Sequence, residues 1–110
     1  MLTLKTMPVS TNRLYRGRRF LTNEGRGNKE AMAWEAKAAW RKPPLQGPVA
    51  VSVALYWPNA RNHDLDNIKG LLDAFTGVLY EDDSQIVELH ISKHIDRENP
   101  RVELELDSVV

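Results

Sequence analysis

Cysteine is absent from the 110 residues of this chain. Disulfide bonds, thiolate metal sites and cysteine nucleophiles are therefore excluded. No apolar run approaches the ~20 residues that span a bilayer, and no hydrophobic signal segment follows Met1. We therefore expect a cytoplasmic protein with no membrane partner.

Several motifs of catalysis and nucleotide binding are also missing. No Gly-x-Ser-x-Gly sequence is present, which disfavours a hydrolase with a serine triad. The glycine-rich loops of nucleotide-binding proteins are absent as well, so we expect no nucleotide cofactor. The three histidines, His63, His90 and His94, match no familiar zinc spacing, and zinc is disfavoured.

The net charge of zero hides a strong asymmetry between the two parts of the chain. Residues 1–47 carry ten basic and three acidic side chains, a net charge of +7, and residues 48–110 carry the balancing −7. A basic face joined to an acidic centre suits a polyanionic substrate and a metal site. The same split could also serve to hold the two parts together.

The length and the patterning predict one α+β domain over residues 1–110. Residues 2–6 and 49–57 are predicted strands. Residues 86–95 and 102–106 alternate apolar and polar side chains and are predicted to form a terminal antiparallel pair. Small residues on the second face of the 49–57 strand suggest that this face is covered too: Ala50, Ser52 and Ala54.

Two helices are predicted to cover this mixed sheet. The first spans residues 28–41 and ends before Pro43-Pro44. The second spans residues 66–77, with Gly77 as its C-terminal cap. Residues 14–20 are rich in arginine, and their sequence leaves a small hairpin and an ordered loop both open.

Acidic residues follow the central predicted strand. Asp64 and Asp66 point the same way if their segment is extended, and Glu81-Asp82-Asp83 begins fifteen residues after Asp66. Several carboxylates in one neighbourhood favour a hard divalent cation such as Mg²⁺, with Mn²⁺ as an alternative. The competing interpretation is that Asp66 only caps the next helix and the later acids form a solvated turn.

Four short motifs together resemble those of the RusA-type crossover junction endodeoxyribonucleases, the Holliday junction resolvases. They match in order and approximate spacing from Pro8 to Lys93, and they are Pro8-x-Ser10-x-Asn12-x-x-Tyr15, Asp64-x-Asp66-Asn67, Asp73-Ala74 and Asp82-Asp83-x-Gln85. The resemblance implies a RusA-like fold and a homodimer that binds four-way junction DNA. It also implies symmetric, Mg²⁺-dependent nicking of two strands in recombination and repair.

The resemblance also implies roles for individual residues. Asp64, Asp66 and Asp83 correspond to the metal-binding and catalytic acids of the family, and Ser10-Thr11-Asn12-Arg13 to a segment associated with DNA contact. The neighbouring arginines Arg16, Arg18 and Arg19 either bind the DNA backbone or form a solvated surface.

The sequence departs from the family pattern at Lys69. The family places a functional lysine four residues after the second aspartate, whereas Lys69 follows Asp66 by three residues. One residue turns a helix by roughly 100°. Lys69 is therefore either the catalytic lysine on an altered helix start or a solvent-facing partner of Asp73.

Two further hypotheses follow from these features. The altered spacing of Lys69 favours an accessory protein that binds junctions but has weakened catalysis. A metal-dependent nuclease that acts on other branched DNA would carry the same acidic residues.

Overall fold

A computed structural model of the chain describes residues 1–8, 15–16, 20–21, 23–59 and 68–109. Four strands form one mixed sheet in the order β1-β6-β4-β5, and a separate two-stranded hairpin pairs β2 with β3. In chain order the elements are β1 Leu2–Leu4, β2 Tyr15–Arg16, β3 Phe20–Leu21, α2 Asn23–Trp40, β4 Val49–Trp57, α3 Ile68–Ala74, the 3₁₀ helix η2 Asp83–Gln85, β5 Ile86–Ile95 and β6 Arg101–Ser108.

Strand β4 occupies the centre of the sheet, parallel to β5 on one side and antiparallel to β6 on the other. The predicted direct pairing of residues 86–95 with 102–106 is therefore wrong, because β4 lies between these two strands. Every second side chain of β4 is buried and the others are half-buried, so β4 is suited to a central position. The turn at residues 96–100 carries the chain from one side of β4 to the other.

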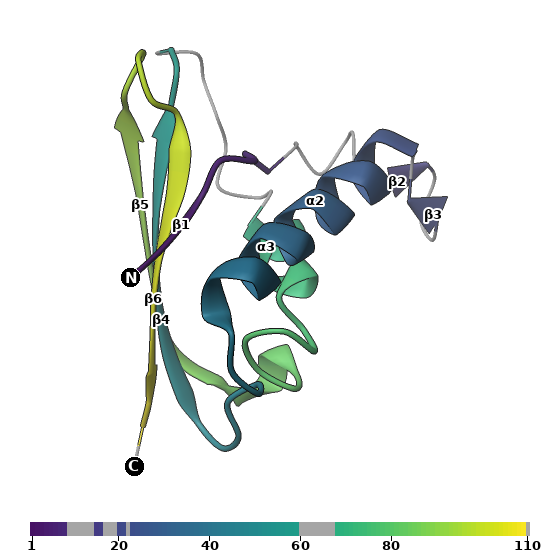
Figure 1. Cartoon of the computed structure of the whole chain (residues 1–110), viewed down its shortest axis with the longest axis vertical. Helices are drawn as coiled ribbons and strands as arrows, with labels where there is room; N and C mark the ends of the chain where they lie inside the picture. Colours follow the sequence, from purple (N-terminus) through teal and green to yellow (C-terminus); the bar gives the residue numbers. More distant parts are fainter. Residues whose placement is uncertain (9–14, 17–19, 22, 60–67, 110) are drawn as a thin grey trace.

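Both helices lie on one face of the sheet, and the core fills the space between the two layers (Figure 1). The expectation that the second face is also covered is not met by the described residues, none of whose helices lies there. Ala50, Ser52 and Ala54 are nevertheless half-buried. Their register partners on β5 and β6 include the longer side chains of His90, Glu103 and Glu105.

The helices differ from their predicted limits. Helix α2 begins at Asn23, five residues earlier than predicted, and Arg41 follows its end with a φ of 53°. Helix α3 ends at Ala74, before Gly77, because the chain tightens there. The Thr76 N–H donates to the Asp73 carbonyl only three residues back, and Gly77 has a φ of 82°. No helix in the described part of the chain is long and apolar enough to cross a membrane.

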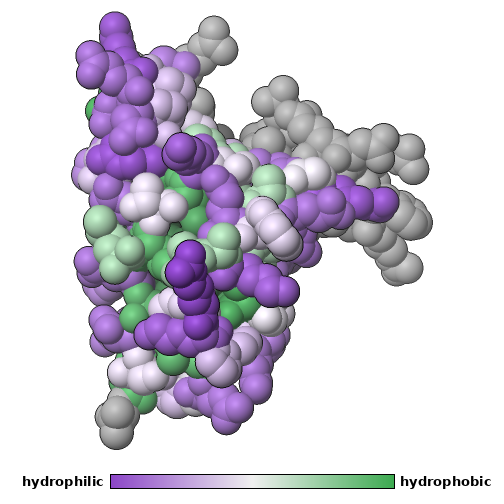
Figure 2. Space-filling view, viewed as in Figure 1, coloured by the Kyte–Doolittle hydropathy of each residue, from purple (hydrophilic) through white to green (hydrophobic). Residues whose placement is uncertain are grey.

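The arginine-rich segment contains a hairpin, which resolves the choice left open by the sequence. Tyr15 pairs with Leu21, and Arg16 pairs with Phe20. The hairpin lies beside the N-terminal end of α2, away from the sheet (Figure 1). In the same view, hydrophobic atoms gather nearer the sheet, whereas the described surface toward the hairpin is largely hydrophilic (Figure 2).

Candidate functional site

The acidic turn, residues 81–85, precedes β5 and contains the candidate ligand Asp83. Asp82 is the N-cap of η2, and its Oδ2 accepts hydrogen bonds from the backbone N–H and the hydroxyl of Ser84. These hydrogen bonds lower the pKa of Asp82, and the bond from the Ser84 hydroxyl has the larger effect. The carboxylate of Asp82 is therefore used inside the turn itself.

Gln85 attaches this turn to the loop before β4. Its Oε1 accepts from the backbone N–H groups of Glu81 and Asp82 at 2.7 and 2.8 Å. Its Nε2 donates to the carbonyls of Leu45 and Gly47 at 2.9 and 2.8 Å. One side chain thus closes a capping box and links two segments that are about forty residues apart in the sequence.

Asp83 differs from Asp82 in the way its side chain is used. It is exposed at the first position of η2, and its carboxylate has no hydrogen bond or ion pair with any other described residue. A carboxylate held by a rigid turn and open to solvent is available to a cation or another ligand.

Burial and three aspartates, two in the acidic turn and one on α3, raise the pKa of Tyr80. The Tyr80 hydroxyl donates to the Leu72 carbonyl at 2.6 Å. Burial raises the pKa of Tyr80, and the negative charges of Asp83, Asp73 and Asp82 raise it further. The acidic turn and the end of α3 therefore share one region of negative potential.

Lys69 lies on α3 with an exposed side chain. Asp73 stands one helical turn later and is half-buried, but within the described residues Lys69 forms no ion pair with it. Of the two interpretations of Lys69, the structure thus gives no support to the pair with Asp73. The catalytic role of Lys69 stays a prediction.

The chain before the predicted DNA-contact segment is tied to α2. The two carboxylate oxygens of Glu35 accept from the backbone N–H groups of Lys5 and Thr6, each at 3.0 Å. The Asn28 side chain donates to the Met7 carbonyl at 2.7 Å. Residues 5–7 are therefore anchored to α2 directly before residues 8–20, which we call the basic segment because they contain Arg13, Arg16, Arg18 and Arg19.

We expect Glu35→Gln to destabilise the protein by about 1–2 kcal/mol, because the new amide places an NH₂ donor against a backbone N–H. The measurement is the free energy of unfolding in urea. Glu30→Gln, an exposed position on the same helix, is the matched control. Equal effects of the two substitutions would show that only the lost charge matters.

Most of the predicted site residues lie outside the described residues. Lys69 and Asp83 are described in full, and Arg16 is described for its backbone alone. Within the described part of the chain, no group of three His, Asp or Glu side chains is placed to hold a metal ion. The residues outside it are Ser10, Thr11, Asn12, Arg13, Arg18, Arg19, Asp64 and Asp66.

The sequence assigned no structural task to Gln85 or Glu35. A signal existed for Gln85, since an N-capping aspartate followed three residues later by glutamine is a capping-box pattern. No local signal existed for Glu35, because its partners are 29 and 30 residues away in the sequence.

Comparisons with known proteins agree with the motifs. A family model described as endodeoxyribonuclease RusA matches residues 5–107, a range that includes every candidate site residue. The crossover junction endodeoxyribonuclease RusA of Escherichia coli strain K12 is 33% identical over 102 residues, which cover 88% of this chain and 85% of that protein. The corresponding protein of Enterobacteria phage 82 is 32% identical over 102 residues, with the same coverage. Uncharacterized protein YqaN of Bacillus subtilis is 32% identical over 87 residues, covering 59% of this chain and 61% of that protein.

Proposed function

This chain belongs to the RusA family of endodeoxyribonucleases, and from that membership we propose that it cleaves four-way DNA junctions. The observation that carries the proposal is the family match over residues 5–107, which spans the acidic turn and the basic segment together. The protein nicks two strands of the junction at symmetric positions, and this cleavage serves DNA recombination and repair.

A divalent cation fits the chemistry of the acidic turn. Asp83 offers an exposed carboxylate without a described partner, and the negative potential around Tyr80 favours a nearby positive charge. We propose that Asp83, with Asp64 and Asp66, holds Mg²⁺ or alternatively Mn²⁺. When bound, the cation supplies charge neutralisation at the phosphate and a more acidic water.

The remaining chemistry belongs to side chains of the protein. Gln85 holds the turn in place, so that Asp83 need not reorganise when it binds a ligand. The exposed ammonium group of Lys69 stabilises negative charge that develops on the scissile phosphate. The arginines of residues 13–19 bind the phosphate backbone of the DNA arms without reading sequence.

The active form is a homodimer. Two-fold symmetry in the protein matches the approximate two-fold symmetry of a four-way junction and provides two active sites. Each site then nicks one of two equivalent strands.

The test compares three DNA substrates of the same sequence: a mobile four-way junction, a linear duplex and a flap. With Mg²⁺ present we expect paired nicks in the junction, at a rate at least about 100-fold above that on the duplex. Chelation of the metal with EDTA should abolish cleavage. Tight binding of the junction without any nicking would instead support an accessory protein.

Equal cleavage of flap and junction would contradict junction selectivity and support a nuclease for branched DNA in general. Cleavage that persists in EDTA would contradict the metal site. The two results are independent, because one varies the substrate and the other the cation.

A further inference from the structure

Strand β5 lies at one edge of the sheet, and most of its residues are exposed. Only Ile86 and Ile91 of this strand pack against the core, and they are partly buried. Val87 and Ile95 are 57% and 56% exposed, and Leu89 is 39% exposed. Half of the large hydrophobic residues that are exposed in the described chain therefore lie on this one strand.

Most of these apolar side chains share one face of β5. Leu89, Ile91 and Ile95 stand opposite Val51, Val53 and Trp57 of β4, all of which are buried in the core. Because neighbouring residues in register point to the same face, the apolar residues of β5 face the helix side. Val87 lies at a register irregularity directly before them. We call Leu89, Ile91 and Ile95 the β5 stripe.

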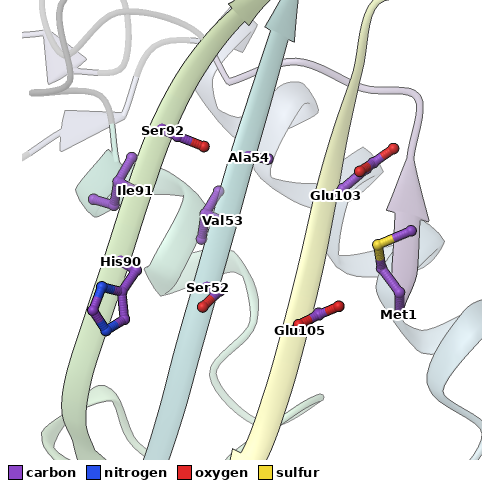
Figure 3. A pocket seen from close by; sticks show the side chains of 9 residues that line it. All are labelled: Met1, Ser52, Val53, Ala54, His90, Ile91, Ser92, Glu103 and Glu105. Carbon is purple, nitrogen blue, oxygen red and sulfur yellow. The ribbon is translucent and has the colours of Figure 1, made fainter.

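The backbone of β5 has one open edge as well. The strand is ten residues long and ends the strand order, so no other described strand pairs with its outer side. Figure 3 shows three adjacent strands, β5 with His90, β4 with Ser52 and β6 with Glu105. In this view β5 lies at the outer edge of the sheet, beyond β4. A long edge strand with apolar side chains is prone to pair with another strand.

We propose that β5 pairs antiparallel with β5 of a second copy of this chain, about a two-fold axis that passes through Ile91. This inference rests on the homodimer of the proposed function and adds the surface that forms it. The two sheets join into one continuous sheet of eight strands, and the two β5 stripes meet on its helix side.

The register follows from the residues that this pairing brings together. A two-fold axis perpendicular to the sheet keeps the helix side of both copies on the same side. Residues that stand opposite each other must therefore point to the same face, so their positions differ by an even number. Centred on Ile91, the pairing places Val87 against Ile95, Leu89 against the aliphatic stem of Lys93, and Glu88 against His94 of the second copy. Apolar contacts and a carboxylate–imidazole pair thus form on opposite faces.

Neighbouring registers fit less well. Centring on His90 places Ile95 against Gln85 and the two His90 rings against each other. Centring on Ser92 places Glu88 against Asp96, a repulsive pair. Centring on Leu89 leaves Ile95 outside the contact.

His94, the histidine that this pairing uses, lies on the face of the sheet opposite the helices, and two neighbouring side chains orient it. His94 stacks on the Tyr56 ring with 4.7 Å between ring centroids, and its Nε2 lies 2.9 Å from the Ser92 hydroxyl. The ring is therefore held by two neighbours on its own sheet. Its Nδ1 is the atom that would meet Glu88 of the second copy.

Because the chain has no cysteine, one introduced thiol tests the register. Two Ile91→Cys copies would face each other directly, within the Cα separation of up to about 7 Å that a disulfide tolerates. Two Leu89→Cys copies would be offset by four residues along the strands, or roughly 14 Å. Under mild oxidation we expect the Ile91→Cys chain to form linked dimers at least about tenfold faster.

A second measurement uses exposed positions, so that folding is not at risk. We expect Ile95→Lys to raise the dimer dissociation constant at least about tenfold in sedimentation equilibrium, because it places an ammonium against apolar Val87. Val109→Lys, at an exposed position outside β5, should leave the constant unchanged.

The outcomes separate the surface from the proposed function. A dimer that withstands Ile95→Lys, or that links through Leu89→Cys as fast as through Ile91→Cys, would overturn this pairing and leave junction cleavage untouched. A wild-type chain that stays monomeric at micromolar concentration would overturn the homodimer and its surface together. Absence of junction cleavage by the wild-type chain, together with rapid linking of the Ile91→Cys chain, would contradict the function alone.

Discussion

Asp83→Asn is expected to lower the rate of Mg²⁺-dependent junction cleavage by at least about 100-fold, with the fold unchanged. Removing one negative ligand weakens the hold on the cation, and the positive charge that would neutralise the reacting phosphate is lost with it. The exposed position of Asp83, without a hydrogen bond to any described residue, means that stability should change little.

The neighbouring residue provides a matched control for this experiment. Asp82→Asn removes the same charge from the same turn, but asparagine is an equally good N-cap and can still accept from Ser84. We expect its cleavage rate to stay within a few-fold of wild type. Rates are measured in single turnover over a range of Mg²⁺ concentrations, with circular dichroism as the check on folding.

Two results would count against this assignment. Equal losses in the two variants would show that only the net charge of the turn matters. Full activity of Asp83→Asn would exclude this carboxylate as a metal ligand. A loss that excess Mg²⁺ restores would point to weakened cation binding rather than to a misplaced phosphate.

Gln85→Leu is expected to destabilise the protein by about 2–4 kcal/mol, because four hydrogen bonds are lost and four backbone groups lose their partner. For a domain of this size the unfolding temperature should fall by roughly 10 °C or more. Cleavage should fall as well at temperatures where the variant is folded, since the turn no longer holds Asp83.

Gln46→Leu is the matched control for that variant. It makes the same change in the same region but removes one exposed hydrogen bond, from Gln46 Nε2 to the Glu81 carboxylate at 3.3 Å. We expect it to cost less than about 0.5 kcal/mol. If the two glutamine variants lose equal stability, Gln85 is not the anchor of the acidic turn. If Gln85→Leu loses stability but keeps full activity, its effect on Asp83 is contradicted.

Sequence periodicity predicted the strands better than it predicted their neighbours. Alternation gave residues 49–57 and 86–95 as strands with the limits that the structure has. It could not tell that β6 pairs with β4 rather than with β5, since a short turn between two strands usually makes them partners. Here β5 and β6 both pair with β4, the most buried strand, and β6 pairs with β1 on its other side.

The limits of the helices depended on contacts that local patterns do not carry. Gly77 resembled a helix cap, yet α3 ends at Ala74 because Tyr80 and the following turn bend the chain back. The backbone of Gly77 donates to the Tyr80 carbonyl at 2.7 Å, and this contact forms only once the loop is folded.

By itself, the sequence determined the family, the mixed α+β domain and the acidic residues that serve as candidate ligands, because motifs and periodicity are local properties of the chain. Only the tertiary structure decided that Asp82 is used within its own turn while Asp83 is left exposed. It also decided that Gln85 and Glu35 anchor the acidic turn and the start of the basic segment, and that β5 forms an apolar edge. The physical reason is that hydrogen bonds and burial between residues 29 to 40 positions apart exist only after the chain has folded.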